Sequence, residues 1–599
     1  MDYIDRVKDA FQRNDLSIDS FNRLTNWLTG EEYKSFHGEL HELIDSNSWD
    51  ELEDRFYTII DFGTGGRRGA RGAGTNRINT RTIAESAQGL AACIHDKGNP
   101  ERGVVVTFDT RHQSREFART VCEVLAGNNI PSYMYDQPRS TPQLSFSIRH
   151  LNAQAGCMIS ASHNPPSDNG IKVSWADGGQ VVPPYDKEII RHVTEVENVQ
   201  SMDFDKAVTN GLITIAGKEL DEAYLETLKS LSLSNKRNAR IAYSPLHGVG
   251  ATNVVKLLES LDFDLHTCEE QMTPDPDFTT VKNHLPNPEL PDAMEHVTQY
   301  AEKIQADIAL ASDPDADRIG ACIPCPKWYK PSGWMFLTGN QIGALILDHV
   351  VSRLKKSGRM PDHPVLIKTI VTTELLDAIC KANKIEVISD LLVGFKYIAE
   401  VTDQLPEHKT PIFQTEESHG YNRGVFVRDK DSAPAALHLA ELASELKDQN
   451  QTLFDKLFDL YRTYGLFVEH TRSVFYHGKT GREKMIKIME KLRSHPPRAI
   501  GNYKLHHLID RASNMIVNAN GTVIGTIEQH TGNVLQFCFE ASGINRLTAR
   551  PSGTEPKIKF YAQLWKHIDS GADNKTIVSL QNSLINEANM LIDAIASDE

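Results

Sequence analysis

Ser160-Ala-Ser-His-Asn-Pro-Pro-Ser-Asp-Asn-Gly-Ile-Lys172 is the stretch around which the rest of this sequence is interpreted. The apolar run Cys157-Met-Ile159 precedes it, and the change to Pro, Asp, Asn and Gly predicts a strand that ends in a loop. Loops at the ends of parallel strands carry binding groups in α/β proteins. Ser162 is a candidate nucleophile, because His163 and Lys172 offer the base or the positive field that a hydroxyl needs. Taken alone, the stretch is equally compatible with a surface turn rich in hydrogen-bonding residues.

Strand-like and helix-like segments alternate through most of the chain. Val104-Val-Val-Thr-Phe108 predicts a buried strand, and the periodicity of residues 113–125 predicts the helix that follows it. A second strand–loop–helix unit is expected between residues 241 and 261, and an amphipathic helix after Gly339 begins a third block. Alternating strands and helices predict parallel, doubly wound sheets, so we expect three blocks of α/β architecture. Further strands are expected at 307–311, 365–370, 385–388 and 411–413.

The two ends of the chain differ from this pattern. Residues 1 to about 55 are polar, with apolar positions at helical spacing, and predict a few amphipathic helices without visible chemistry. From about residue 470 onward, an amphipathic helix at 484–492 and several short strands are expected. Apolar and polar residues alternate at 558–564, which predicts a half-buried strand. We therefore expect an N-terminal helical extension and a smaller C-terminal α+β domain.

The composition describes an ordinary soluble globular protein, with 40% apolar and 24% charged residues. Its 599 residues suggest roughly four domains of about 150 residues each. The 80 acidic and 64 basic residues give a formal charge of −16, which argues against broad nucleic-acid binding but not against phosphorylated metabolites. No apolar run approaches the ~18 residues that span a bilayer, and the N-terminus lacks the features of a signal peptide. We expect a cytoplasmic protein with no membrane or nucleic-acid partner.

The eight cysteines do not suggest a disulfide framework in so long a chain, and several lie in apolar runs. Buried, reduced thiols in a cytoplasmic protein fit this distribution best. Cys322-Ile-Pro-Cys325 has CxxC spacing, but no second Cys/His pair follows at the distance of a zinc site, so a metal or redox role there is disfavoured.

Ser312-Asp-Pro-Asp-Ala-Asp-Arg318 places three carboxylates at alternate positions after a predicted strand. Hard oxygen ligands on a short arc suit Mg²⁺ or Mn²⁺, and three close negative charges would otherwise repel one another. An EF-hand is excluded, because its sixth position would be Arg318 and its twelfth Pro324. A phosphatase of the haloacid dehalogenase type, with Asp313 as nucleophile, is a rival that leaves Ser162 without a purpose. An Asp-rich turn that caps a strand also stays open.

Three other loops are suited to sugar phosphates. Two of them contain arginine guanidinium groups and glycines that leave the backbone N–H groups accessible, so that both can surround an anion. These loops are Phe62-Gly-Thr-Gly-Gly-Arg-Arg-Gly69 and Arg550-Pro-Ser-Gly-Thr-Glu-Pro556. Thr415-Glu-Glu-Ser-His-Gly420 offers carboxylates and hydroxyls suited to vicinal sugar hydroxyls. Together with Ser162 and the Asp-rich loop, these pieces favour an enzyme that moves a phosphoryl group between the two ends of a sugar.

The motifs, in this order, resemble those of the α-D-phosphohexomutase superfamily, most closely its phosphoglucomutase/phosphomannomutase branch. The resemblance covers nearly the whole chain from about residue 56. The N-terminal extension and Pro274-Asp-Pro-Asp-Phe278 make the sequence similar to the phosphoglucomutase-2/phosphopentomutase group. The motifs are FGTxGxRG at 62–69, Phe108-Asp-Thr-Arg-His112, Ser140-Thr-Pro142, Ser160-Ala-Ser-His-Asn-Pro165, the Asp-rich loop at 312–318, Gly394-Phe-Lys-Tyr397, Glu416-Glu-Ser418 and the loop at 550–556.

The resemblance implies four domains around one central cleft. The first three would be similar mixed α/β sheet domains, and the fourth a C-terminal α+β domain. The expected segments are a helical extension at 1–55, domain I with the phosphoserine loop at 56–220, domain II with the metal loop at 221–330, domain III with the sugar-binding loop at 331–470 and domain IV with the phosphate-binding loop at 471–599.

The resemblance also implies roles for single residues. Ser162 would be the phosphoserine of the resting enzyme, and Mg²⁺ would be held by a phosphate oxygen on Ser162 together with Asp313, Asp315 and Asp317. The positions that match those flanking the transferred group are Arg68, His163 and Lys172, and Lys430 matches a lysine proposed as general acid/base. The substrate-binding positions would be Arg318, Gly394, Glu416, Ser418, Arg550, Ser552, Gly553 and Thr554.

The function implied is that of a phosphohexomutase. It would interconvert hexose 1-phosphate and hexose 6-phosphate, with glucose favoured, through a phosphoserine enzyme and a hexose 1,6-bisphosphate. Mg²⁺ would be the cofactor and hexose 1,6-bisphosphate the activator; the partner would be a small sugar phosphate, and the oligomeric state stays open, a monomer included. Phosphomannomutase and phosphopentomutase activities are alternatives on the same scaffold, and an Asp-nucleophile sugar phosphatase is an alternative of another class. A sugar-bisphosphate synthase would need an external donor, and a non-catalytic binding protein is disfavoured.

The sequence departs from the family pattern at five positions. The departures leave the phosphoryl chemistry intact but leave sugar preference and the role of Lys430 open. The residues concerned are Thr415 and Ser432 in place of Gly, His419 in place of Phe, Gly65 in place of Ala and Arg67 in place of Leu.

Overall fold

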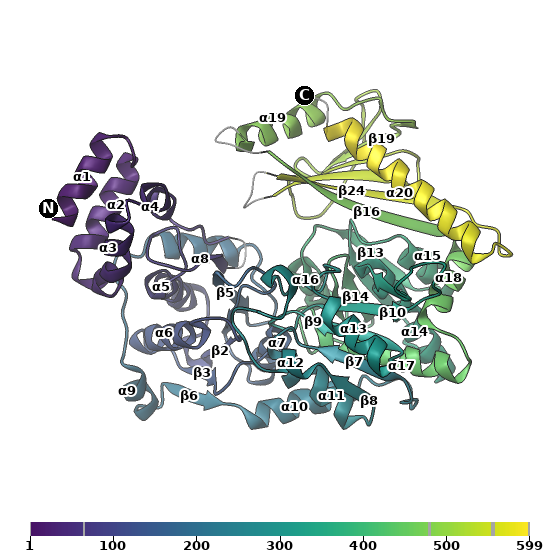
Figure 1. Ribbon diagram of the computed structural model, residues 1–599, viewed down its shortest axis with the longest axis horizontal. Helices are drawn as coiled ribbons and strands as arrows, with labels where there is room; N and C mark the ends of the chain where they lie inside the picture. Colours follow the sequence, from purple (N-terminus) through teal and green to yellow (C-terminus); the bar gives the residue numbers. More distant parts are fainter. Residues whose placement is uncertain (1, 64–65, 477–480, 553–556, 597–599) are drawn as a thin grey trace. The chain divides into compact units, whose positions relative to one another are not determined.

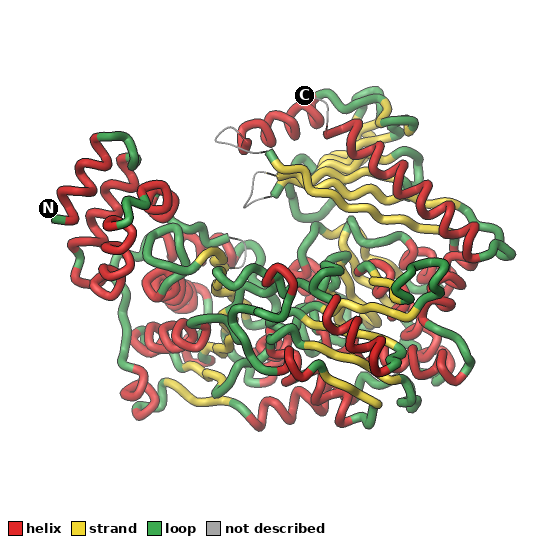
Figure 2. The backbone as a smooth tube through the Cα atoms, viewed as in Figure 1, coloured by secondary structure: helices red, strands yellow, loops and turns green. Residues whose placement is uncertain are grey.

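The computed structural model describes residues 2–63, 66–476, 481–552 and 557–596 of the chain. The chain divides into two compact units, and Figures 1 and 2 show its helices and strands. The first unit comprises Met1–Ser232, Arg240–Ala321 and Gly424–Leu437. The second comprises Leu233–Ala239, Cys322–Arg423 and His438–Glu599. Each unit is therefore assembled from segments that are distant in the sequence.

Four α-helices form the N-terminal extension, drawn in purple in Figure 1: α1 (Tyr3–Gln12), α2 (Ile18–Thr29), α3 (His37–Asp45) and α4 (Trp49–Phe56). Their apolar residues meet in one core, in which Leu24, Leu40 and Phe56 are fully buried. Ser17 caps α2, because its side chain accepts a hydrogen bond from the Ser20 amide. The amphipathic helices predicted for this region are present.

The first sheet has six strands, in the order β1 (Gly66–Ala70), β5 (Asp168–Trp175), β4 (Ala155–Ile159), β2 (Val104–Phe108), β3 (Ser132–Tyr135) and β6 (Ile213–Ala216). The last four run parallel, whereas β5 and β1 pair antiparallel at one edge, so the sheet predicted as parallel is mixed. Helices cover both faces. Val104 and Val106 lie in one core with α5 (Thr80–Lys97) and α6 (Ser114–Gly127), and Val105 lies in another with α7 (Thr141–His150).

The second sheet has five strands, in the order β11 (Trp334–Leu337), β10 (Ile319–Pro324), β9 (Ile308–Ser312), β7 (Arg240–Ser244) and β8 (Asp264–Thr267). Strands β9 and β8 both pair parallel with β7. The neighbouring helices include α11 (Val254–Ser260) and α13 (Glu295–Ile304). Strand β9 is fully buried and ends at Ser312, so the Asp-rich loop begins at the carboxyl end of a central strand.

The third sheet has the order β13 (Glu386–Leu391), β12 (Pro364–Thr369), β14 (Thr410–Glu416) and β15 (Gly420–Asn422). Strands β13, β12 and β14 run parallel, and β15 returns antiparallel to β14. Helix α14 (Gly339–Lys356) begins with a capping box formed by Thr338 and Gln341. The other helices of this part are α15 (Leu375–Asn383), α16 (Phe395–Gln404), α17 (Ser432–Asp448) and α18 (Leu453–Tyr464).

The fourth sheet is wholly antiparallel, with the order β16 (Leu466–Phe475), β24 (Lys557–Lys566), β23 (Arg546–Pro551), β22 (Leu535–Cys538), β19 (His507–Asp510), β20 (Met515–Asn518) and β21 (Val523–Thr526). Helices α19 (Gly481–Ser494) and α20 (Asn574–Ala596) complete it, and α20 lies along β16 and β24 (Figure 1). The strand predicted at 558–564 is present as part of β24, but the prediction that it is half-buried is wrong. Tyr561 and Gln563 are only 4% and 2% exposed, so both faces of β24 are covered.

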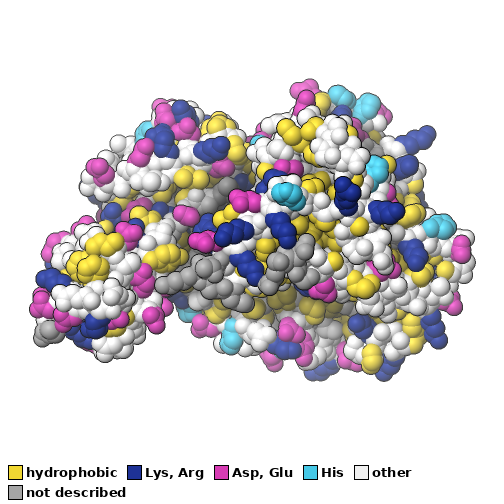
Figure 3. Space-filling model, turned by 90° about the horizontal axis from the view of Figure 1, so that it is seen from above, with side chains coloured by type: hydrophobic (Ala, Val, Ile, Leu, Met, Phe, Trp, Pro, Cys, Tyr) yellow, Lys and Arg dark blue, Asp and Glu magenta, His cyan; other side chains and the backbone are white. Residues whose placement is uncertain are grey.

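Three mixed α/β sheets followed by an antiparallel sheet confirm the predicted fold class. The domain boundaries predicted near residues 55, 220, 330 and 470 stay predictions, as does the central cleft. Among the described residues, no helix has the length and apolar character needed to cross a membrane. On the described part of the face in Figure 3, Lys and Arg side chains lie scattered among Asp and Glu side chains.

Candidate active site

Ser162 follows β4, in a segment here called the Ser162 loop (residues 160–172, of which 168–172 form the start of β5), and its side chain is almost fully buried. Its backbone is left-handed, with a φ of 52°. Such a conformation costs a non-glycine residue about 1–3 kcal/mol and persists only where its surroundings hold it. The Ser162 amide donates a hydrogen bond of 2.7 Å to Oγ of Ser160. The loop therefore presents one hydroxyl from a strained, fixed backbone.

The guanidinium of Arg111 binds the backbone of the Ser162 loop. It donates to the carbonyl oxygens of Ser162 at 2.6 Å and Asn164 at 2.5 Å. It also donates to those of Pro165 at 2.7 Å and Asp168 at 3.1 Å. A guanidinium has five donors in a fixed fork, which suits several carbonyls at once. Arg111 thus supplies the support that the strained backbone requires.

A segment before the Asp-rich loop supports Arg111 in turn. The guanidinium carbon of Arg111 lies 5.0 Å from the ring centre of Phe278, a cation–π contact, and Phe278 is fully buried. Nε2 of His112 lies 2.8 Å from Oδ1 of Asp277. Sequence reasoning missed the roles of Arg111 and Phe278. Both lie in motifs of the family pattern, at 108–112 and 274–278, but their proximity is visible only in three dimensions.

The Asp-rich loop lies beside Ser162, as predicted. Oγ of Ser162 donates a hydrogen bond of 2.6 Å to Oδ2 of Asp313. Asp313, Asp315 and Asp317 are buried, and one carboxylate oxygen of each lies within 4.8 Å of the others. Thr141, from the motif at 140–142, donates a 2.6 Å hydrogen bond to Asp315, another role that sequence reasoning missed. The residues predicted to hold the metal therefore meet at one place.

The three carboxylates of this acidic triad have divergent pKa values. Burial and repulsion by its two neighbours raise the pKa of Asp313 well above its ordinary value, and burial together with Asp315 raises that of Asp317. Burial alone would also raise the pKa of Asp315, but Lys172 holds it far below its ordinary value. Burial therefore disfavours the form of the triad in which all three carboxylates are ionised.

This acidic triad fits a hard divalent cation. Among the described residues, none donates a hydrogen bond to Oδ1 of Asp315 or of Asp317, and both atoms are buried. Buried acceptors without donors, in a cluster of three carboxylates, match the oxygen ligands that Mg²⁺ prefers.

Cationic side chains surround the triad. Nζ of Lys172, on β5, lies 2.5 Å from Asp315 and 3.6 Å from Asp317. Nζ of Lys430 lies 3.2 Å from Asp317 and 3.0 Å from Asp429. Arg318 contacts Asp317 at 3.6 Å. The structure thus brings both predicted lysines to the acidic triad.

His163 and Arg68 complete this set. Nδ1 of His163 lies 3.1 Å from Oγ of Ser162. Burial, with the nearby guanidinium groups of Arg318 and Arg68, lowers the pKa of His163 well below its ordinary value, so its imidazole is neutral at pH 7. Arg68 lies on β1, more exposed, with its guanidinium 3.4 Å from Oδ1 of Asn164. A neutral imidazole beside a serine hydroxyl can accept a proton.

The predicted sugar and phosphate positions belong to the second unit. Gly394 precedes α16 with a φ of 129°, Glu416 is buried at the end of β14, and Ser418 follows in the turn before β15. Arg550 lies on β23, and the Ser552 amide donates to the Lys557 carbonyl at 2.8 Å. Gly553 and Thr554 lie outside the described residues. That these positions face Ser162 stays a prediction.

Comparison with known proteins identifies the family. Models of the phosphoglucomutase/phosphomannomutase α/β/α domains I, II and III match residues 60–200, 222–325 and 338–464. A phosphoglucomutase of Staphylococcus aureus (strain bovine RF122 / ET3-1) is 35% identical over 520 residues, which are 86% of this chain and 91% of that protein. The chain belongs to the phosphoglucomutase/phosphomannomutase family. It is therefore a phosphohexomutase, an intramolecular phosphotransferase of the isomerase class, and the Asp-nucleophile phosphatase alternative is not supported.

Solved structures of this family share the fold. A putative phosphomannomutase from Thermus thermophilus superposes with a TM-score of 0.63 at 22% identity, covering 90% of this chain and 99% of that one. The open form of pp63/parafusin, a phosphoglucomutase from Paramecium, also gives a TM-score of 0.63, at 17% identity, and covers 91% and 97% of the two chains. At these identities the likeness concerns the fold alone.

Several residues that differ from the phosphohexomutase pattern make specific contacts in the structure. Oγ of Ser432 donates a 2.7 Å hydrogen bond to the carbonyl oxygen of Ala316, within the Asp-rich loop. Arg67 is buried and donates to the Thr82 carbonyl at 2.7 Å. The ring of His419 stacks on Phe336. Thr415 is buried, and Gly65 lies outside the described residues. Ser432 therefore adds a hydrogen bond to the acidic loop that a glycine there could not supply.

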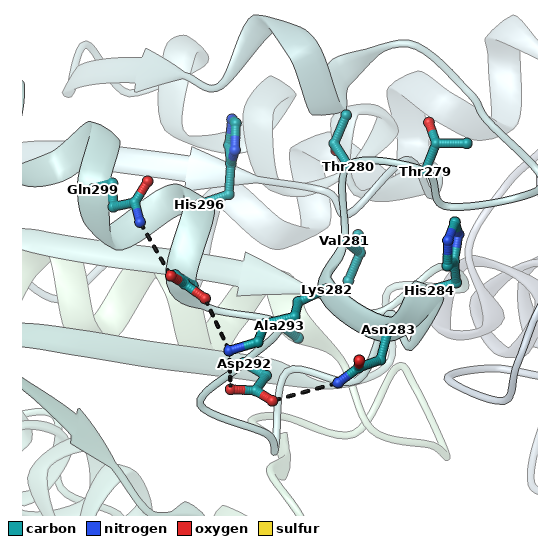
Figure 4. A pocket seen from close by; sticks show the side chains of 11 residues that line it. Thr279, Thr280, Val281, Lys282, Asn283, His284, Asp292, Ala293, His296 and Gln299 are labelled. Atoms are coloured by element: carbon teal, nitrogen blue, oxygen red, sulfur yellow. Dashed lines mark hydrogen bonds and ion pairs between the residues drawn. The ribbon is translucent and has the colours of Figure 1, made fainter.

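A separate cavity of about 390 Å³ lies in the first unit (Figure 4). Its walls are residues 279–284 and residues around the start of α13. Lys282 lies 3.1 Å from Asp292 and 3.3 Å from Glu295, so the charges of the wall are paired with one another. None of the described residues that line this cavity is a predicted site residue.

Proposed function

We propose that this phosphohexomutase interconverts hexose 1-phosphate and hexose 6-phosphate, with glucose as the favoured sugar, through phosphorylated Ser162. The observation that carries the proposal is the 2.6 Å contact between Oγ of Ser162 and Asp313 of the buried acidic triad. A serine hydroxyl alone does not explain three buried carboxylates beside it. A phosphoryl group on that hydroxyl does, because it would share a divalent cation with them.

The proposed reaction has two transfers. In the first, the bond between phosphorus and Oγ of Ser162 breaks, a bond from phosphorus to the free sugar hydroxyl forms, and that hydroxyl loses its proton to a base. The hexose 1,6-bisphosphate turns round within the site. In the second transfer its other phosphoryl group passes to Ser162, and a proton returns to the oxygen that is left on the sugar. The net reaction moves one phosphate and consumes nothing.

Mg²⁺ would be held by Asp313, Asp315, Asp317 and a phosphate oxygen on Ser162, where it would neutralise charge on the transferred group. Lys172 and Lys430 add positive charge at the acidic triad, and Arg68 adds it near His163. The base that takes the proton of the sugar hydroxyl would be His163, Lys172 or Lys430. The imidazole of His163 is neutral and can accept a proton, and Lys430 matches a general acid/base position in some relatives.

Other predicted residues would bind the rest of the substrate. Glu416 and Ser418 would bind sugar hydroxyls, Gly394 would lie in the loop that distinguishes the two orientations of the bisphosphate, and Arg318 of the first unit would contact the sugar phosphate. The non-reacting phosphate would bind at Arg550, Ser552, Gly553 and Thr554. We also propose that the chain belongs to the phosphoglucomutase-2/phosphopentomutase group, because it carries the extension and the motif at 274–278.

The deciding experiment replaces Ser162 by Ala. The variant should lose mutase activity and the phosphorylated form of the protein detected by intact-mass analysis. Ser167→Ala is the matched control, since Ser167 is an exposed serine in the same loop whose hydroxyl donates a hydrogen bond to its neighbour Asp168. Wild-type activity in Ser162→Ala would overturn the proposal. Glucose 1-phosphate, mannose 1-phosphate and ribose 1-phosphate, assayed side by side with a trace of the matching bisphosphate, would assign the sugar.

A further inference from the structure

The loop after β1 is bound on one side by the N-terminal extension. Ala73 is fully buried in the core formed by α1–α4. Its amide donates to Oε2 of Glu39 at 3.0 Å, and its carbonyl oxygen accepts from Nη1 of Arg55 at 3.1 Å. Glu39 and Arg55 form an ion pair of 2.5 Å, in which the Arg55 side chain is only 12% exposed. One ion pair of the extension therefore binds both backbone groups of Ala73.

The backbone on either side of Ala73 lies directly against α4. Gly72 and Gly74 have φ values of 142° and 135°, and a Cβ there would lie 2.8 Å and 2.7 Å from atoms of Arg55. The amide of Asn76 donates to the Arg55 carbonyl at 2.9 Å. Only glycine combines these backbone angles with so close an approach.

The same loop is bound on its other side to the Ser162 loop. The Arg71 amide donates to the Ser167 carbonyl at 2.9 Å. Immediately before it, β1 pairs with β5, with Ala70 opposite Asp168 and Gly66 opposite Lys172. Only Gly72 separates Arg71 from Ala73, so a shift of Ala73 would be passed to the Ser162 loop.

We propose that Glu39 and Arg55 are positioning residues for phosphoryl transfer. By fixing Ala73 they hold Arg71 and β1, and through them the loop that carries Ser162. The inference rests on the proposed role of Ser162 as carrier of the phosphoryl group. A displacement of about 1 Å can cost roughly 100-fold in rate, and Ser162 has a strained backbone that must be held from outside. The extension, in which the sequence shows no chemistry, thereby acts on the reaction without touching the substrate.

The test compares Glu39→Ala with Glu31→Ala in the full chain. Glu31 lies in the same extension, and its side chain is 81% exposed and paired with Lys34. Glu39→Ala should lower kcat on the order of ten-fold with little change in KM. Amide hydrogen exchange should rise at 66–74 and 160–172 and not across the rest of the first unit. Glu31→Ala should resemble the wild type. Glu39→Gln, which keeps an acceptor for the Ala73 amide, should restore most of kcat.

Three results would overturn the inference. The first is a wild-type kcat in Glu39→Ala. The second is an increase in amide hydrogen exchange spread evenly over the first unit. The third is a kcat of Glu39→Gln as low as that of Glu39→Ala. Ser162→Ala, assayed in parallel, separates this inference from the proposed function. If Ser162→Ala is inactive while Glu39→Ala behaves as the wild type, only the positioning role fails. If Ser162→Ala is fully active, the proposed function fails first.

Discussion

Nζ of Lys172 lies 2.5 Å from Oδ2 of Asp315, and the pair joins two loops that are 143 residues apart in sequence. Lys172 ends the Ser162 loop on β5, and Asp315 lies after β9. The Asp315 side chain has no exposed surface and that of Lys172 is 13% exposed. The ammonium holds the pKa of Asp315 far below its ordinary value in spite of burial. The pair thus keeps Asp315 ionised and fixes β5 beside the acidic triad.

Replacement of Lys172 by Met should be costly for both stability and activity. Removal of one partner of a buried ion pair costs about 3–5 kcal/mol. We expect a lower melting temperature by circular dichroism, and a fall in kcat on the order of 100-fold, because a cation beside the transferred group is lost. Lys172→Arg keeps the charge and should recover most of the stability. Equal melting temperatures of Lys172→Met and the wild type would contradict the buried pair.

Arg111→Lys should impair catalysis although the charge is retained. A lysine ammonium has three donors and no fixed fork, so it cannot bind the four carbonyls that Arg111 binds. We expect faster hydrogen exchange in the Ser162 loop and a fall in kcat on the order of 100-fold, with KM less affected. Arg115→Lys, at another position of the same region, is the control. Unchanged exchange at 160–172 in Arg111→Lys would show that the loop holds its shape without the guanidinium.

The sequence was sufficient to predict the α/β architecture and the meeting of Ser162 with the acidic triad. Each loop follows a buried strand, but β4 and β9 belong to different sheets, so the meeting of the loops was expected from the combination of motifs and the resemblance to the family and not from strand order. The antiparallel pairing of β5 was not predicted from the alternation of elements. The reason is the length of the connection between the strands. Residues 160–167, between β4 and β5, are too few for the crossover of about a dozen residues that a parallel pair needs.

The supporting residues could not be predicted from local pattern. Arg111 and Phe278 meet across 167 positions (278 − 111), and nothing near either residue indicates the other. Thr141 reaches Asp315 across 174 positions. Tyr561 was expected to be half exposed because its strand alternates, but it is buried beside Ile370 and Leu392, which come from another sheet's loops. Such contacts depend on how elements pack, which local periodicity does not contain.

Binding of Mg²⁺ to the acidic triad should release protons. Without a cation, burial and mutual repulsion raise the pKa of Asp313 well above its ordinary value and raise that of Asp317. A bound divalent cation favours the ionised carboxylates, so affinity should increase with pH. Titration calorimetry in buffers of different ionisation enthalpy would measure the release. Identical heats in all buffers would contradict it.

The same titration can locate the bound Mg²⁺. Asp315→Ala should abolish saturable Mg²⁺ binding and metal-dependent turnover, while the circular dichroism spectrum stays that of the wild type. Asp292→Ala is the matched control, because Asp292 is an exposed carboxylate paired with Lys282 at the cavity of Figure 4. Saturable binding that survives in Asp315→Ala and disappears in Asp292→Ala would move the metal site to that cavity.

The second unit contains a buried histidine that should make its stability depend on pH. Nδ1 of His438, on α17, lies 3.4 Å from the carboxylate of Glu441. That carboxylate also accepts hydrogen bonds from the amides of Leu233 and Ser234. Burial lowers the pKa of His438 to about 4, even though Glu441 opposes the shift. In the unfolded chain the same imidazole binds a proton near pH 6.5.

The sign of this effect follows from the lowered pKa. Above about pH 6.5, His438 is neutral in both the folded and the unfolded state, and its contribution to stability is complete. As the pH falls towards about 4, the unfolded state takes up a proton at His438 that the folded state does not, and stability is lost. The loss is at most about 1.4 kcal/mol per pH unit. His438→Leu should therefore flatten the pH dependence of the urea midpoint between 6.5 and 4. His567→Leu, at a side chain that is 77% exposed, should keep the wild-type slope. A slope that persists unchanged in His438→Leu would assign the acid sensitivity to other groups.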